Sequence, residues 1–107
     1  MFLKEIKARE IKDSRGEPTI EVLINNQKAS SPSGKSKGSH ETPSYHVNLN
    51  WNIKAIINLK IPFEISSFQD LRKLESFITK KFKLSSAKQF GANALFALES
   101  AILKAIA

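Results

Sequence analysis

A polar stretch in the first half of the chain, SSPSGKSKGSHETPSYH at residues 30–46, holds most of the side chains that could do chemistry. Residues 34–36 read Gly-Lys-Ser, the end of the loop in which backbone amides and a lysine surround the phosphates of a nucleotide. That pattern requires a glycine where Ala29 stands, and a helix after the serine, where Gly38 and Pro43 disfavour one. We therefore expect no nucleotide binding through this stretch.

The two histidines of the chain, His40 and His46, lie in the same stretch, with Glu41 beside the first. Their separation differs from the i, i+4 spacing with which a helical zinc site places its histidines on one face. Proximity in sequence also does not supply the geometry in which a base activates a hydroxyl, so Ser36 and Ser39 near His40 make no triad. Taken alone, these residues predict solvated histidines and no self-contained catalytic site.

The composition is that of an ordinary globular domain, with 107 residues of which 41% are hydrophobic and 25% are charged. This length suffices for one domain with a modest core. The chain has no cysteine, which excludes disulfides and thiolate chemistry and favours an intracellular location. Charges interrupt the opening MFLKEIKAREIKD, so it is neither a signal peptide nor a membrane span, and we expect a cytoplasmic protein with no membrane partner.

The net charge of +7 is spread along the chain. Such an excess favours acidic or polyanionic partners, but domains that bind nucleic acid cluster lysine and arginine together with stacking aromatic residues. The densest cluster, KKFK at residues 80–83, has a simpler explanation as the end of a helix, where cations complement the helix dipole. We therefore do not expect nucleic-acid binding.

The N-terminal third has the period of two that is typical of half-buried strands. Residues 2–11 alternate imperfectly, whereas Ile20, Val22 and Ile24 share one face of a second strand. Turn residues between these runs predict an antiparallel hairpin, and an Asn-Asn turn leads into a short third strand over residues 27–31. The prediction for this part is a three-stranded antiparallel β-meander.

The second half changes to helical spacing. Ser67 and Asp70 resemble the two ends of a capping box ahead of an amphipathic helix. The apolar positions of this helix are Leu71, Leu74, Ile78 and Phe82. Residues 91–107 are rich in Ala and Leu and predict another helix, whereas residues 51–59 fit either a helix or a strand. The predicted fold class is α+β, a meander followed by a helical half.

In the helix predicted over residues 91–107, the larger apolar residues are expected along one side. They are Leu95, Leu98, Ile102 and Ile106, with Phe96 and Leu103 adjacent. This spacing is typical of a helix that covers a core with one face.

Three motifs also follow one another in a fixed order. They are AREIKDSRGEPTIEV at residues 8–22, PSGKSKGSHE at residues 32–41 and FGANALFALESAILKAIA at residues 90–107. They resemble A-R-x-x-x-D-S-R-G-x-P-T-x-E-V, P-S-G-A-S-T-G-x-H-E and L-G-A-N-A-I-L-x-V-S-x-A in the N-terminal domain of the enolases, the enzymes that dehydrate 2-phosphoglycerate to phosphoenolpyruvate. The order and spacing of the three are more specific than any one of them.

The resemblance implies an enolase N-terminal-domain-like fold, with a mobile loop that closes over substrate bound to a separate barrel domain. The candidate substrate-loop residues are Ser33, Gly34, Ser36, Gly38, His40 and Glu41. Ser36 is expected to help bind a second Mg²⁺, a cation that prefers oxygen ligands, only when the barrel is present. The catalytic base and acid belong to the barrel in this family, so we expect no catalytic residue in this chain.

The resemblance also implies contacts between subunits. Arg9 and Glu21 match family positions that form ion pairs across the subunit interface, and Arg15 lies in the same turn motif. We expect an enolase-type barrel chain as partner and allow for a homo- or hetero-oligomer. The loop departs from the family at Lys35 and Lys37, where the enolases usually carry alanine and threonine.

We expect residues 1–107 to form a single domain, with strands at about 2–31, the mobile loop at about 32–50 and helices at about 51–107. The leading hypothesis is the capping subunit of a split enolase, favoured by the start at Met1 and the end at the domain junction. The alternative is a non-catalytic paralogue that binds a protein or polyanion, suggested by the loop lysines. A third possibility is an excised part of a longer enzyme.

Overall fold

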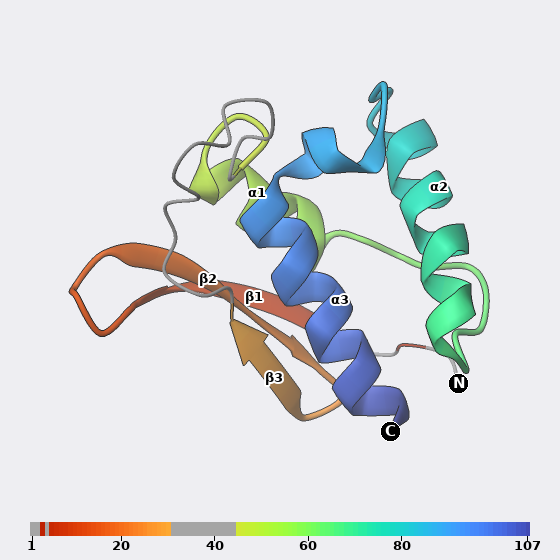
Figure 1. Cartoon of the computed structure of the whole chain (residues 1–107), viewed down its shortest axis with the longest axis horizontal. Helices are drawn as coiled ribbons and strands as arrows, with labels where there is room; N and C mark the ends of the chain where they lie inside the picture. The colour runs from red at the N-terminus through yellow and green to blue at the C-terminus, as the bar shows by residue number, and fades with distance from the viewer. Residues whose placement is uncertain (1–2, 4, 31–44) are drawn as a thin grey trace.

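The computed structural model describes residue 3, residues 5–30 and residues 45–107, and in this part of the chain helices cover one face of a sheet (Figure 1). The strands are β1 (Ile6–Lys12), β2 (Pro18–Ile24) and β3 (Gln27–Ser30). The helices are α1 (Leu49–Ile57), α2 (Leu71–Lys81) and α3 (Ala92–Ile106), with short 3₁₀ turns η1 (Phe68–Asp70) and η2 (Ala87–Phe90). The antiparallel meander followed by helices confirms the predicted α+β fold class.

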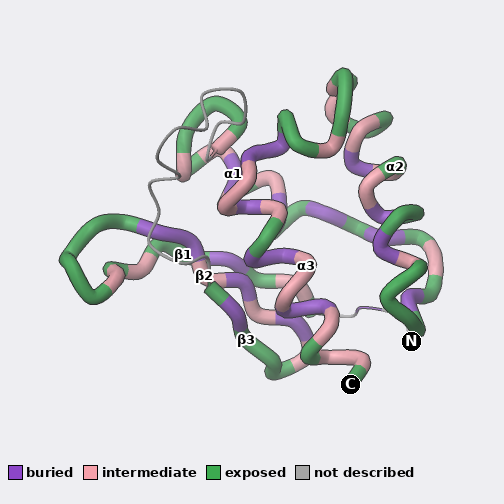
Figure 2. Tube along the Cα trace, in the orientation of Figure 1, coloured by how far each residue is buried: buried purple, intermediate pink, exposed green. Residues whose placement is uncertain are grey.

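The central strand β2 makes the largest contribution of the sheet to the core, to which β1 and β3 add Ala8 and Ala29. Its inner residues Ile20, Val22 and Ile24 are fully buried, as their alternation predicts, and Figure 2 shows buried stretches both in the strands and in the helices that lie over them. Helix α3 contacts β2 and β3, and α1 contacts β1. On the outer face, Lys7 and Lys28 are exposed, so the sheet is apolar on one side only.

Both hairpin turns use residues that tolerate a left-handed backbone. In the β1–β2 turn, Gly16 has a φ of 79°, and the Asp13 carboxylate accepts the backbone N–H groups of Arg15 and Glu17 at 2.8 and 2.9 Å. These hydrogen bonds, the one from Glu17 first, lower the pKa of Asp13. In the β2–β3 turn, the asparagines at 25–26 have φ angles of 48° and 75°, as a type I′ turn requires.

Helix α1 occupies the segment for which the sequence left helix and strand open. It begins at Leu49, two residues before the pattern indicates, because the Asn48 side chain accepts the Trp51 N–H at 2.8 Å and so caps the first turn. Ile56 is fully buried against the core, and Pro62 follows the helix in the connection to α2. The cap, rather than isoleucine's preference for sheet, decides the local structure.

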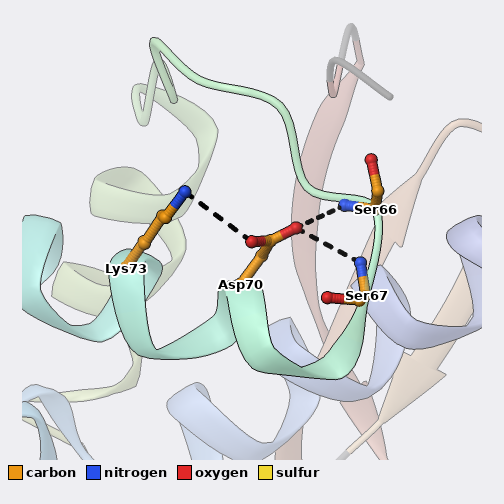
Figure 3. A network of polar contacts seen from close by, with 4 residues as sticks. All are labelled: Ser66, Ser67, Asp70 and Lys73. Atoms are coloured by element: carbon orange, nitrogen blue, oxygen red, sulfur yellow. Dashed lines mark hydrogen bonds and ion pairs between the residues drawn. The ribbon is translucent and has the colours of Figure 1, made fainter.

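Helix α2 starts from a turn held by Asp70 (Figure 3). Oδ2 of Asp70 accepts the backbone N–H groups of Ser66 at 2.8 Å and Ser67 at 3.3 Å, and Oδ1 lies 3.8 Å from Lys73 Nζ. These hydrogen bonds, the one from Ser66 first, lower the pKa of Asp70. The predicted Ser67–Asp70 capping pair is confirmed. The residues that α2 then buries are Leu71, Leu74 and Ile78.

Helix α3 packs on the sheet mainly through small side chains. Its buried residues are Ala94, Ala97, Leu98, Ala101 and Ile102. Leu98 and Ile102 belong to the predicted apolar side, whereas Leu95 and Ile106 are only partly buried and Phe96 is 51% exposed. Small side chains at a contact allow a helix to approach its neighbour closely. No helix in the described residues has the length and apolar character that crossing a membrane requires.

Candidate functional site

The predicted substrate loop belongs to a segment whose two flanks are part of the described fold. Its candidate residues lie outside the described residues; they are Ser33, Gly34, Ser36, Gly38, His40 and Glu41. The segment, residues 31–44, directly follows β3 and directly precedes Tyr45. The described geometry therefore shows how the flanks of the predicted loop are held.

Asn52 holds the downstream flank. Its side chain is fully buried in α1, where Oδ1 accepts the His46 N–H at 2.8 Å and Nδ2 donates to the Phe90 carbonyl at 2.7 Å. One amide thus joins the residues that follow the loop to the turn that precedes α3. Because a buried amide costs free energy unless it is hydrogen-bonded, satisfying both of its ends stabilises this one arrangement.

Aromatic rings surround this hydrogen-bonded centre. The Trp51 ring centroid lies 4.6 Å from that of His46, 5.2 Å from Phe82 and 6.1 Å from Phe90. The Phe82 and Phe90 centroids are 5.7 Å apart. Tilted and edge-to-face pairs of this kind contribute about 0.5–1.5 kcal/mol beyond their burial. The cluster therefore ties the downstream flank of the loop to the end of α2 and to the start of α3.

The His46 ring is exposed but has a defined partner. Its Nδ1 lies 2.9 Å from the carbonyl oxygen of Gln89. A carbonyl oxygen only accepts hydrogen bonds, so the proton of the neutral ring is on Nδ1, and Nε2 is left as an acceptor. His46 thus has a structural contact at the loop flank, whereas His40 lies outside the described residues.

Sequence reasoning missed Asn52, although a signal for it was present. Asn48 is a favoured N-cap residue, and a helix starting at residue 49 puts Asn52 and Ile56 on one face, a turn apart. An asparagine on an apolar face must find hydrogen-bond partners inside the protein. That rule would have identified Asn52 as a buried anchor, although not its partners.

Two of the three predicted interface residues meet on the outer face of the sheet. Arg9 and Glu21 are opposite one another in the β1–β2 register, and Arg9 Nε donates to Glu21 Oε1 at 2.8 Å. The Arg9 side chain is 67% exposed and that of Glu21 is 16% exposed. The pair borders a shallow hollow of about 400 Å³ that Lys7, Leu23 and Lys28 also line. An ion pair this open to water contributes about 0–1 kcal/mol.

Arg15, the third predicted interface residue, lies apart from this pair. It sits in the β1–β2 turn, beyond the Lys12–Pro18 pairing that ends the ladder. Its backbone N–H donates to Asp13, and its side chain is exposed. The structure thus brings Arg9 and Glu21 together and leaves Arg15 at the tip of the hairpin.

The described residues do not by themselves fit a magnesium ion. Among them, no three His, Asp or Glu side chains gather in a way that could hold a metal. Magnesium requires a nearly octahedral shell of oxygen ligands. Two candidate carboxylates, Asp13 and Asp70, accept backbone hydrogen bonds in turns, and Glu21 is paired with Arg9. Ser36, the predicted ligand, lies outside this part of the chain.

Known proteins resemble this chain over nearly its whole length. A family model described as "Enolase, N-terminal domain" matches residues 3–107. The enolase of Ehrlichia ruminantium (strain Gardel) is 35% identical over 120 residues, which cover 98% of this chain and 28% of that protein. The enolases of Elusimicrobium minutum and Methanococcus aeolicus are 33% and 32% identical, covering 96% of this chain and 27% of their own length.

The chain therefore spans little more than a quarter of the length of these relatives. The family match agrees with the observed order of the elements, a meander followed by helices. It also agrees with the three ordered motifs in the sequence, which the matched range contains. This chain belongs to the enolase N-terminal domain family.

Proposed function

We propose that the chain is the lid, or capping, domain of an enolase and supports the Mg²⁺-dependent dehydration of 2-phosphoglycerate to phosphoenolpyruvate together with a separate barrel chain. The observation that carries this proposal is the family match over residues 3–107. The proposal assigns the chain to glycolysis in the cytoplasm.

The proposed lid is the loop that contains Ser36, which would give an oxygen ligand to a second Mg²⁺ at the barrel. A lid excludes water and completes a site when its middle moves relative to fixed flanks. Two contacts support such flanks here, since Ser30 is paired with Glu21 in the sheet and His46 is bonded to Asn52. The proton transfers of the reaction are assigned to the barrel.

We also propose that Arg9 and Glu21, with Arg15 nearby, contact a neighbouring subunit. The Arg9–Glu21 pair lies on the outer face of the sheet, which no described helix covers. An exposed pair can exchange its internal contact for one with a partner at little cost in free energy. The shallow hollow beside it offers apolar area from Leu23 between lysines.

The test is to mix the 107-residue chain with an enolase barrel chain that lacks its own N-terminal domain. Complex formation is measured by analytical ultracentrifugation, and phosphoenolpyruvate formation is followed with and without Mg²⁺. We expect a complex and a Mg²⁺-dependent activity that neither chain has alone. If neither a complex nor activity is found, the capping proposal is wrong.

A Ser36→Ala variant then tests the loop within that mixture. We expect kcat to fall about tenfold or more, equivalent to about 1.4 kcal/mol in the barrier, with complex formation unchanged. Ser39→Ala, in the same loop, is the matched control and should retain activity. Equal activity of the two variants would remove Ser36 from the site without affecting the capping role.

A second candidate function is a non-catalytic module that binds an acidic protein or a polyanion. It is favoured by lysines at positions 35 and 37, in a chain of net charge +7. Here we expect the chain to bind RNA or an acidic protein with an affinity that falls as salt rises. The double substitution Lys35→Ala and Lys37→Ala should abolish this binding, and a wild-type chain that binds neither ligand excludes the function.

A further inference from the structure

The end of α2, the η2 turn and the start of α1 lie along one side of the molecule, at the top of Figure 1. Two contacts join these segments. The ring centroids of Trp51 and Phe82 are 5.2 Å apart, and Nδ1 of His46 lies 2.9 Å from the Gln89 carbonyl oxygen. Residues that are distant in the sequence therefore form one surface here.

This surface is basic. The segments that contribute to it, residues 45–58 and 76–98, contain no aspartate or glutamate. Its exposed lysines are Lys81, Lys83 and Lys88. Among the described residues, these three ammonium groups form no hydrogen bond and no ion pair, and Lys81 Nζ lies 5.8 Å from the centroid of the Phe82 ring. The positive charge is therefore concentrated on this side and is not neutralised by the described part of the fold.

Lys83 occupies a backbone position that favours glycine. The Leu84 N–H donates to the Thr79 carbonyl at 2.9 Å and the Lys83 N–H donates to the Lys80 carbonyl at 3.3 Å, and these hydrogen bonds close the end of α2. Within this turn Lys83 has a φ of 56°, which strains any residue with a Cβ atom. Glycine in its place should therefore remove the cation and keep the turn.

Aromatic rings lie beside these cations. His46 is exposed, and Trp51 and Phe82 are only partly buried. The hydrogen bond to Gln89 fixes the His46 ring, whose centroid is 4.6 Å from that of Trp51, and leaves Nε2 as an acceptor. Fixed rings next to cations are typical of proteins that bind single-stranded nucleic acids, in which bases stack on the rings and phosphates contact the cations.

We propose that this surface binds single-stranded RNA. It consists of His46, Trp51, Lys81, Phe82, Lys83 and Lys88. A base stacks on the His46 ring, which Trp51 supports, and the adjacent phosphates lie against the lysines. A ribose 2′-hydroxyl donates to Nε2 of His46, which selects RNA over DNA. An acidic protein would supply carboxylates for the lysines but no flat bases for the rings.

The proposal rests on the second candidate function, the polyanion-binding module. It revises the expectation drawn from the sequence, in which the KKFK run at residues 80–83 was explained by the end of a helix alone. The folded chain adds the rings of His46 and Trp51 to that run, and no local pattern in the sequence predicts this contact.

The probe for this surface is a fluorescein-labelled RNA octamer of adenosines, titrated with the full chain at about 50 mM salt and followed by fluorescence anisotropy. The matched control is an abasic RNA octamer, which keeps the phosphates and riboses but has no bases. We expect it to bind about tenfold more weakly or worse, because stacking is lost. The DNA octamer of the same sequence should bind several-fold more weakly than the RNA.

The fluorescence of Trp51 shows where the RNA binds. Trp51 is the only tryptophan in the chain, so a change in tryptophan emission on addition of unlabelled RNA reports on this surface. We expect the adenosine octamer to quench this emission and the abasic octamer to leave it nearly unchanged.

Lys83→Gly tests the cations in a variant that should fold at least as well as the wild type. We expect RNA binding to weaken about threefold to tenfold, and the slope of log affinity against log salt to fall by about 0.7, as for one lost phosphate contact. Lys12→Gln, at an exposed position at the end of β1, is the matched control with the same loss of charge and should bind as the wild type does.

His46→Phe tests the ring and its acceptor separately. The variant keeps a ring for stacking but has no Nε2, so we expect it to bind the RNA and DNA octamers equally. Circular dichroism verifies that each variant folds. Equal binding of the adenosine and abasic octamers, equal binding of RNA and DNA by the wild type, or equal effects of Lys83→Gly and Lys12→Gln would overturn the proposal.

Failure of this surface can be told apart from failure of the module function. RNA binding that is abolished by the loop substitutions Lys35→Ala and Lys37→Ala, but unchanged by Lys83→Gly, would overturn the surface and leave the module function in place. A chain that binds polyglutamate but not RNA would do the same. A chain that binds neither ligand excludes both.

Discussion

Two polar centres next to α3 meet their hydrogen-bonding needs in opposite ways. At the downstream flank of the loop, the buried Asn52 amide is paired at both ends, with His46 and Phe90. Between α2 and α3, Oε2 of Glu99 is buried and has no hydrogen-bond partner among the described residues, and burial together with the nearby Glu75 raises the pKa of this carboxyl to about 8. The first centre specifies a position inside the fold. The second costs free energy, because a buried oxygen without a hydrogen-bond donor loses its hydration and gains no replacement.

The largest effect on stability is expected from Asn52→Ala, which removes both hydrogen bonds of the buried amide. The substitution leaves the His46 N–H and the Phe90 carbonyl without their partner, and we expect the free energy of unfolding to fall by about 2–4 kcal/mol. Urea denaturation measures this change. Asn50→Ala, exposed on the same helix, is the control and should change the free energy by less than about 0.5 kcal/mol. A similar small loss for Asn52→Ala would show that the centre does not anchor the fold.

Removing the carboxyl of Glu99 should raise the free energy of unfolding, whereas Asn52→Ala lowers it. In the folded chain the pKa of Glu99 is raised from 4.5 to about 8, so between these values the unfolded chain has released a proton that the folded chain still holds. The free energy of unfolding therefore falls as pH rises from about 4.5 to about 8 and then levels off.

Glu99→Gln should remove this slope and stabilise the chain above pH 8 by about 1–2 kcal/mol, less than the full shift implies because water screens part of the side chain. Urea denaturation at a series of pH values measures it, with Glu10→Gln as the exposed control. If the variant kept the wild-type slope, the carboxyl would not be the group that titrates.

His46 tests the surroundings of Asn52, because its backbone is bonded to the buried amide while its ring is exposed. His46→Ala removes the exposed bond to the Gln89 carbonyl and the ring contact with Trp51, and we expect a loss of about 0.5–1.5 kcal/mol. His46→Phe keeps a ring and should lose less. Thermal unfolding of the two variants separates the hydrogen bond from the ring contact, and equal losses would assign the whole effect to the hydrogen bond.

The smallest effect on stability is expected at the exposed Arg9–Glu21 pair. Arg9→Ala should lower the free energy of unfolding of the isolated chain by no more than about 0.5 kcal/mol, because water already solvates the guanidinium. A double-mutant cycle with Glu21→Ala measures the pair directly. In the mixture with a barrel chain, the same substitution should weaken association if the proposed interface exists, and an unchanged complex would exclude Arg9 from it.

Most of the elements could be predicted from the sequence because their signals are local. The alternation of Ile20, Val22 and Ile24 predicts β2, and the capping pair Ser67–Asp70 predicts the start of α2. The prediction of the buried face of α3 was less accurate, because it considered leucine and isoleucine and overlooked the buried alanines. Side-chain size, rather than hydrophobicity alone, sets how closely a helix approaches its neighbour.

The candidate sites were only partly accessible from sequence. The ion pair of Arg9 and Glu21 joins residues that the hairpin register places opposite each other, and the motif resemblance had already selected both. The partners of Asn52 and the contact of Glu75 with Glu99 could not be predicted, because no local pattern brings them together. A single glutamate in a helical sequence is most often a solvated one, and only its packing shows otherwise.

By itself, the sequence determined the three strands, the helices α2 and α3 and the three motifs of the family, since hydrophobic period, caps and turn residues act over a few positions; it left α1 open between helix and strand. The tertiary structure decided that Asn52 reaches Phe90, 38 residues away in the chain, and that Glu75 and Glu99 share one hollow. Such long-range contacts depend on how the helices pack on the sheet. The free energy of a buried polar group in turn depends on which hydrogen-bond partner the packing places beside it.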